Sequence, residues 1–375
     1  MRINILLAQY VEKTVLKGRY WEFKALIIIV VCAISVNFGF DLKRWAYIKN
    51  FITLLDGQPL NPKLCCYYWS DIAYQTTDLL MQRLQVWDTV HQANMRFRVF
   101  LPVLWMLFHS AVSIYLLQIA LGLGQLYMTL RIVYSITQDR VLAFYFTFGL
   151  AGLFSGAAFY LDLYGFGDAF AYIFMTSSLY FRKPFLIFVS VFLAALVDER
   201  ALLNTSFIIL FCWLSTNHFD SKKLSFKTFV LNSSVLSILT GSFTYIAIRM
   251  YLTAHFQLKT PYGGPSPFFY VQEALKFFGI RLWTGFESFW ILIVMMIAVL
   301  YYRRIYHLLG LITVLLGITI FTFLLQGDHT RTAAYAFPLL FVALAIIRSE
   351  FNQEELRSTL LIISLIATIF FPIYY

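Results

Sequence analysis

Long apolar runs separated by short polar segments make up most of the chain. The stretches "LIIIVVCAISV" (26–36) and "LLGLITVLLGITIFTFLL" (308–325) lack the apolar–polar alternation that a transmembrane β-barrel strand needs. Since roughly 17–25 apolar residues cross a bilayer as a helix, the pattern predicts an all-α polytopic membrane protein with about 11 transmembrane helices. The stretch 99–130 is too long for one straight span, and we expect "HS" at 109–110 to break it in two.

Polar segments between these runs suggest how one integral membrane domain, residues 1–375, is organised. Residues 1–24 mix basic and aromatic side chains without a cleaved-signal pattern, which predicts a cytoplasmic interfacial segment ahead of a retained first span. The polar stretch 41–98 then forms a large outer loop. A second outer loop, 252–284, is long enough to serve as a mobile flap over a site.

Composition supports the membrane assignment and narrows the choice of partners. The chain is 60% hydrophobic and 13% charged, whereas soluble domains carry about a quarter charged residues. The net charge of +10 comes from dispersed Lys and Arg, which favours topology signals and contacts with membrane lipids over nucleic acid. The four cysteines show no disulfide framework or metal-ligand spacing, so no metal ligand is predicted, although a divalent metal stays open as a cofactor.

Charge in the short connecting segments sets the expected orientation. With a cytoplasmic N-terminus, the inner segments collect most of the basic residues, as the positive-inside rule requires, and most acids fall on the outer side. The inner segments contain no nucleotide-binding fingerprint. We therefore expect a multi-pass protein of a bacterial inner (cytoplasmic) membrane, with its site facing the outside or periplasm.

Asp41 is the first candidate for chemistry on that face. It directly follows the first apolar run, so its carboxylate would lie partly desolvated at the membrane edge. Such a carboxylate can have a raised pKa and act as a base toward a hydroxyl. The alternative is that Asp41 caps the next helix.

Two further polar clusters stand where apolar runs meet on the outer side. In "LVDERALL" (196–203), Arg200 is suited to binding a phosphate bidentately, with Asp198 or Glu199 orienting it; a solvated turn is the alternative. In "GDHTR" (327–331), Asp328 can cap the following helix. The positive charge of Arg331 is unfavourable near a helix N-terminus unless an anion is bound there. His329 stands between Asp328 and Arg331 and is a further candidate for binding the donor phosphate or the acceptor.

Weaker candidates lie elsewhere on the same side. Asp71 is a substitute for Asp41 within the large outer loop. Asp168 stands in "YLDLYGFGDAF" (160–170), which reads mainly as a turn. His91 and Arg98 approach the outer membrane edge ahead of Pro102.

The order of these parts resembles the GT-C superfamily of integral membrane glycosyltransferases. Asp41 is similar to the acidic residue that follows the first span of such proteins, and "Y…LLDGQPLN" (47–61) is similar to the continuation common in them. "RVFLPVL" (98–104), "DERALL" (198–203) and "GDHTR" (327–331) resemble their later elements. The chain departs from many members in having Leu42, not a second acid, after Asp41.

The resemblance implies a reaction. A polyprenyl-phosphate-linked sugar would enter from the outer leaflet, arginines would hold its phosphate, and a carboxylate would deprotonate a glycan or lipid acceptor. A polysaccharide polymerase or ligase of lipid-linked glycans would also have outer arginines. A transporter or flippase of lipid-linked sugar would usually show internal repeats, which this sequence lacks.

Overall fold

Helices dominate the computed structural model. The structure describes residues 9–39, 67–80, 95–220, 224–258, 267–326 and 328–369. Within those ranges the secondary structure consists of α-helices and one 3-10 turn, with no strand. The all-α prediction is confirmed.

Among the described residues, five helical segments are long and apolar enough to cross a membrane, or six if a bent pair counts as one span. These segments make the chain a multi-pass integral membrane protein. The five are α2 (Trp21–Gly39), α7 (Ala111–Thr137), α14 (Ser233–His255), the run of α16 (Phe278–Phe286), η2 (Glu287–Phe289) and α17 (Trp290–Tyr302), and α18 (Tyr306–Leu325). The bent pair is α8 (Arg140–Gly152) and α9 (Phe154–Leu161), which meet at 59°.

The prediction of about 11 spans is therefore wrong. Several apolar runs form helices shorter than these spans: α11 (Pro184–Val197), α12 (Arg200–Thr216) and α20 (Pro338–Ile347). At about 1.5 Å per residue, the 14 residues of α11 extend only ~21 Å, less than the ~30 Å hydrocarbon layer. Every residue of α20 is buried, so its apolar surface packs on protein. Hydropathy does not distinguish a helix that faces lipid from one enclosed by other helices.

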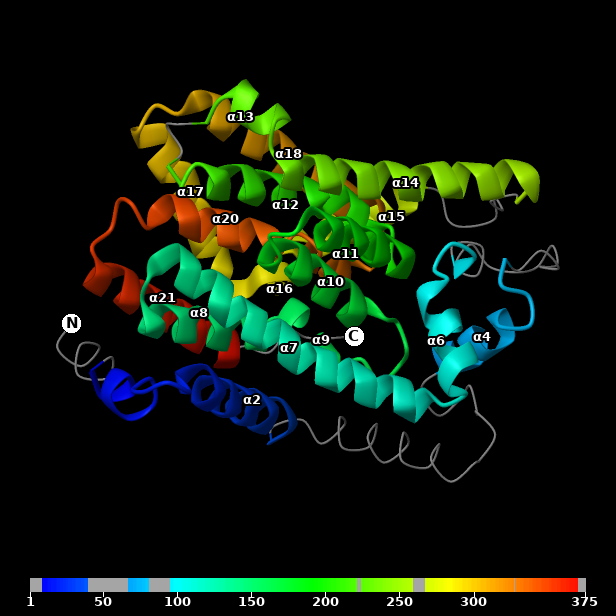
Figure 1. Ribbon diagram of the computed structural model, residues 1–375, viewed down its shortest axis with the longest axis horizontal. Coiled ribbons are helices and arrows are strands. Elements are labelled where there is room, and N and C mark those ends of the chain that lie inside the picture. The colour runs from blue at the N-terminus through cyan, green and yellow to red at the C-terminus, as the bar shows by residue number, and fades with distance from the viewer. Residues whose placement is uncertain are drawn as a thin grey trace.

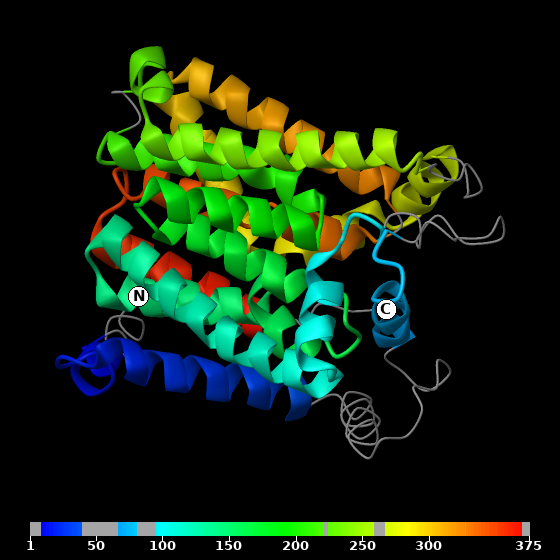
Figure 2. The same cartoon turned by 45° about the vertical axis from the view of Figure 1, so that its right-hand side comes forward.

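Helices α10 (Asp168–Tyr180), α12 and α20 pack against one another in the bundle interior. Figures 1 and 2 show most helices running along one axis, with α2 on one side and α14 and α18 on the opposite side. Further helices in the described part of the chain are α4 (Tyr67–Gln75), α6 (Phe100–Phe108), α13 (Phe226–Val230), α15 (Pro267–Lys276), α19 (His329–Ala334) and α21 (Gln353–Ile369). The predicted break at 109–110 is confirmed: His109 is left-handed with φ 49°, and the Ser110 side chain caps α7.

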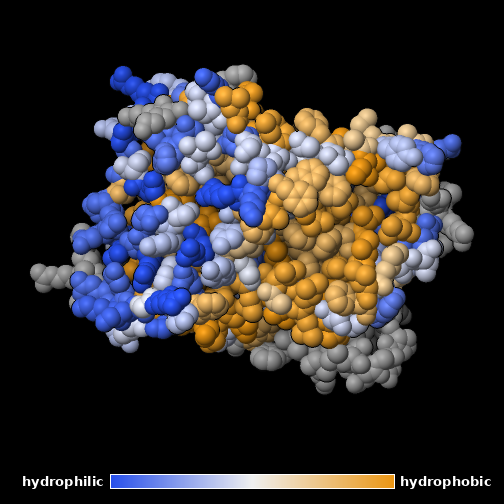
Figure 3. Space-filling view, in the orientation of Figure 1, coloured by the Kyte–Doolittle hydropathy of each residue, from blue (hydrophilic) through white to orange (hydrophobic). Residues whose placement is uncertain are grey.

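Basic side chains gather where one set of helix ends meets. The Arg140 Nη1 donates to the Leu16 carbonyl at 2.8 Å, and the Arg357 Nε donates to Asp139 at 2.7 Å. Arg303 binds Glu350 in the same region. We call this the basic end; the left side of Figure 3 is correspondingly hydrophilic, and hydrophobic residues cover much of the rest of that face.

The two ends give a test of the orientation expected from sequence. We predict that, in a variant lacking the native cysteines, Arg304→Cys at the basic end is protected from an impermeant thiol reagent in intact cells. Lys276→Cys, in α15, should be labelled; both side chains are exposed in the fold, so protection would come from the membrane. Labelling of position 304 and not of position 276 would place the basic end outside the cell and contradict the predicted orientation.

Candidate functional site

The turn between α11 and α12 supplies the first part of a polar network. Asp198 is extended (φ −155°, ψ 129°), whereas Glu199 is already helical (φ −63°, ψ −18°), so the two acids point in different directions. Asp198 accepts from the Arg200 Nε at 2.9 Å and from its Nη2 at 2.8 Å. This bidentate pair fixes the guanidinium plane. Glu199 instead binds Arg249 of α14.

The segment entering α19 supplies the second part. Asp328 precedes the helix, but its side chain does not cap it; the carboxylate accepts from the Arg331 Nη1 at 2.5 Å. The backbone oxygen of Asp328 accepts instead from the Thr332 hydroxyl at 2.7 Å. The Arg331 guanidinium lies 3.9 Å from the Phe166 ring centroid, a cation–π contact that holds its plane.

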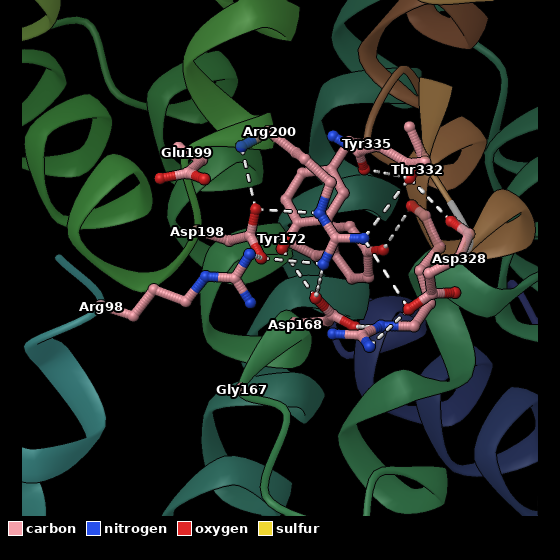
Figure 4. A network of polar contacts seen from close by, with 12 residues as sticks. Arg98, Gly167, Asp168, Tyr172, Asp198, Glu199, Arg200, Asp328, Thr332 and Tyr335 are labelled. Atoms are coloured by element: carbon pink, nitrogen blue, oxygen red, sulfur yellow. Dashed lines mark hydrogen bonds and ion pairs between the residues drawn. The ribbon is translucent and has the colours of Figure 1, made fainter. Parts of the chain in front are cut away.

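Asp168, the first residue of α10, joins these two parts. One carboxylate oxygen accepts from the Arg200 Nη2 at 3.2 Å and from the Tyr335 hydroxyl at 2.8 Å. The other oxygen accepts from the Arg331 Nε. Figure 4 shows the three acids Asp168, Asp198 and Asp328 placed around the Arg200 side chain, with Glu199 pointing away from it. Residues more than a hundred positions apart thus form one network.

Burial divides the acids of this network into two kinds. The Asp168 and Asp198 side chains are enclosed, and those of Arg200 and Arg331 are only 5% and 7% exposed. The Asp328 side chain is 40% exposed. The enclosed acids therefore position arginines, and Asp328 is the carboxylate of this network that a ligand can reach.

Electrostatics favour charged groups here despite the burial. Burial by itself would favour the neutral acid, but the Arg200 and Arg98 guanidiniums overcome it and hold the pKa of Asp198 well below its usual range. The Arg98 Nη2 lies 3.1 Å from the Asp198 carboxylate.

The neighbouring Asp162 behaves differently. Burial raises its pKa to about 6; the negative charge of Asp168 raises this pKa further, and the positive charge of Arg331 lowers it.

Asp162 shapes the loop that carries Asp168. Its carboxylate accepts from three backbone N–H groups, those of Gly165, Phe166 and Gly167, at 3.2, 3.1 and 2.8 Å. Both glycines have left-handed φ angles, 84° and 82°, which residues other than glycine rarely adopt. The turn predicted for "DLYGFGD" is thus held by Asp162, and it places Asp168 within the network.

Other predicted residues lie around or outside this network. The His329 ring contacts Arg281 of α16 at 3.3 Å and packs on Phe323. Asp71 lies in α4, where burial raises its pKa, and is not among the described contacts of the network. Asp41 and His91 lie outside the described residues.

Several buried polar atoms lack a hydrogen-bond partner among the described residues, and two of these groups matter here: one on Arg331, which the sequence had singled out, and one on Glu287, which it had not. The Arg331 Nη2 is buried and lacks a hydrogen-bond partner among the described residues. Glu287, where α16 meets η2, is buried with a left-handed φ of 47°, and both its carboxylate oxygens also lack such a partner. Buried unpaired groups in a membrane protein commonly mark functional positions.

The described residues contain no group of three or more His, Cys, Asp or Glu side chains arranged to hold a metal ion. The network's chemistry is instead that of paired arginines and carboxylates, which bind oxyanions and move protons. In comparisons with known proteins, no family model, curated protein or solved structure matches this chain.

Proposed function

We propose that the protein is a membrane glycosyltransferase of the GT-C type. It would transfer a sugar from a polyprenyl-phosphate donor to a glycan or lipid acceptor at the membrane face opposite the basic end. The network of Asp168, Asp198, Arg200, Asp328 and Arg331 lies at the end of the bundle opposite the basic end. The sequence resemblance supplies the reaction class.

The unpaired Arg331 Nη2 carries this proposal. Its guanidinium is already oriented by Asp168, Asp328 and Phe166, yet one buried donor has no partner among the described residues. Leaving a buried donor unpaired costs about 1–3 kcal/mol. A donor phosphate would satisfy it, and the preformed orientation would reduce the ordering cost of binding.

The reaction then assigns distinct tasks to arginine and carboxylate. The acceptor oxygen attacks the anomeric carbon, the bond from that carbon to the phosphate oxygen breaks, and polyprenyl phosphate leaves. Arg331, supported by Arg200, would stabilise the charge that develops on the leaving phosphate. A carboxylate would take the acceptor proton: Asp41 by its place in the sequence, with the exposed Asp328 as the alternative within the network.

We expect Asp41→Asn to leave donor binding intact and to lower turnover by about a hundredfold or more, the usual contribution of a general base. The assay supplies a polyprenyl-phosphate sugar and an acceptor to purified protein in lipid vesicles and follows transfer. Asp71→Asn, the substitute candidate for the base in the same outer segment, is assayed beside it. Full transfer by Asp41→Asn would eliminate Asp41 as the base and move the role to Asp71, Asp198 or Asp328, of which Asp328 is the exposed carboxylate of the network.

A further inference from the structure

A separate cavity opens at the basic end, formed by the ends of α7, α10, α12 and α20 and the start of α14. Its volume is about 470 Å³, and no acidic residue is among those that line it in the described chain. Its polar lining includes Ser135, Arg182, Ser215, His218, Ser234 and Arg348. Two cations and several hydroxyls thus face one space.

Arg348 has no carboxylate partner within the described chain. Its Nη2 donates to the His218 carbonyl at 3.4 Å, and its guanidinium lies 5.3 Å from the Phe219 ring centroid. Burial lowers the pKa of Arg348, and no neighbouring acid offsets that effect. Arg357, another partly buried arginine of this end, is paired with acids, whereas Arg140 donates to backbone carbonyls. Arg348 is therefore a cation held in place without an anion.

The second cation is also held by the fold. The Arg182 Nη1 donates to the Ser215 hydroxyl at 2.8 Å, which leaves its remaining donors available. His218 and Phe219, which border the cavity, are consecutive left-handed residues with φ angles of 54° and 61°. Such conformations cost about 1–3 kcal/mol each and persist where surrounding contacts impose them. The cavity wall is thus a specifically shaped turn.

We infer that this cavity binds a phosphate-bearing anion through Arg182 and Arg348. Arginine recognises phosphate by paired N–H donors, and basic pockets between transmembrane helices bind anionic headgroups. The volume lies within the range of ligand sites, about 300–1,000 Å³, so a headgroup or a small phosphoester fits. The inference does not rest on the proposed transferase function, whose network lies at the other end of the bundle.

One competing account is that the arginines simply face the helix C-termini that meet here. Those termini carry partial negative charge, which favours cations within the last turn. That account requires no bound anion. Measuring anion binding separates the two.

The test uses the full-length protein, purified in neutral detergent and in phosphatidylcholine nanodiscs. A soluble arm titrates glycerol 3-phosphate by calorimetry, and a lipid arm counts phosphatidylglycerol retained in native mass spectrometry. The pocket variant is Arg182→Gln with Arg348→Gln. The matched control, Lys183→Gln with Arg304→Gln, removes two charges from the same end at positions outside the cavity lining.

We expect the pocket variant to lose at least about tenfold in affinity, or 1.4 kcal/mol, for at least one probe, and the control to resemble the wild type. Loss for phosphatidylglycerol alone identifies a lipid headgroup; loss for glycerol 3-phosphate identifies a soluble phosphate. Ser234→Asp offers a second variant that does not remove an arginine. An acid in the first turn of α14 favours that helix but repels an anion in the cavity, so binding should fall while thermal stability holds. Equal binding of both probes by wild type, pocket variant and Ser234→Asp, or no binding by any of them, would overturn the inference.

Discussion

Asp168→Asn should lower the free energy of unfolding by about 3 kcal/mol, because removing one partner of a buried ion pair leaves charge without compensation. Asp168 contacts both Arg200 and Arg331, so the substitution affects two enclosed guanidiniums together. The amide can still accept from the Tyr335 hydroxyl, which limits the change to the charge. Thermal unfolding and denaturant titration in detergent micelles measure the loss.

Asp328→Asn is the matched control for that experiment. It removes a carboxylate from the same network, but the Asp328 side chain is 40% exposed, and exposed ion pairs contribute about 0–1 kcal/mol. Equal destabilisation by the two substitutions would mean that Asp168 does not hold the network together.

Arg331→Lys should reduce kcat/KM for sugar transfer by about a hundredfold, although the positive charge is kept. Arg331 uses different nitrogens for Asp168 and Asp328 while a third stays unpaired. A lysine ammonium cannot reproduce that planar arrangement. Each charge-assisted hydrogen bond contributes about 1.5–3 kcal/mol, so losing the phosphate contact accounts for the size of the effect.

Arg249→Lys serves as the control for Arg331→Lys. Arg249 pairs with Glu199 and packs on Phe97 at the same end of the bundle, outside the network. We expect near wild-type transfer from it. Thermal unfolding of both variants distinguishes a folding defect from a catalytic one. A comparable loss of transfer in both variants would contradict a specific role of Arg331, because replacing any arginine by lysine at this end would then have the same effect.

The sequence predicted the helical class because apolar runs without alternation fit only helices in a membrane. It overestimated the number of membrane spans because the apolar character of a segment does not show whether the segment faces lipid or is buried in protein. The all-apolar helix α20 lies inside the protein, and α11 is too short to cross. The break between α6 and α7 was predictable because Ser110 is a favourable N-cap.

The candidate site was predictable where charges interrupt apolar runs. That reasoning found Asp198, Arg200, Asp328 and Arg331, which the fold brings into contact. It gave Asp168 little weight because "YGFGD" has the composition of a turn, and the long-range contact to Arg331 has no local signal. It also offered Asp198 and Glu199 as equivalents, whereas the change from extended to helical backbone between them sends only Asp198 to Arg200.

The most direct test of the transferase proposal follows both sugar transfer and lipid movement in one preparation. Wild-type protein is reconstituted in vesicles with a polyprenyl-phosphate sugar and an acceptor, beside Arg331→Lys and protein-free vesicles. The proposal predicts that sugar moves to the acceptor, that polyprenyl phosphate is released in equal amount, and that both fall together in Arg331→Lys. Movement of intact donor between leaflets without any transfer would contradict the proposal and favour a flippase, and joining of lipid-linked glycans in place of single-sugar transfer would favour a polymerase or ligase.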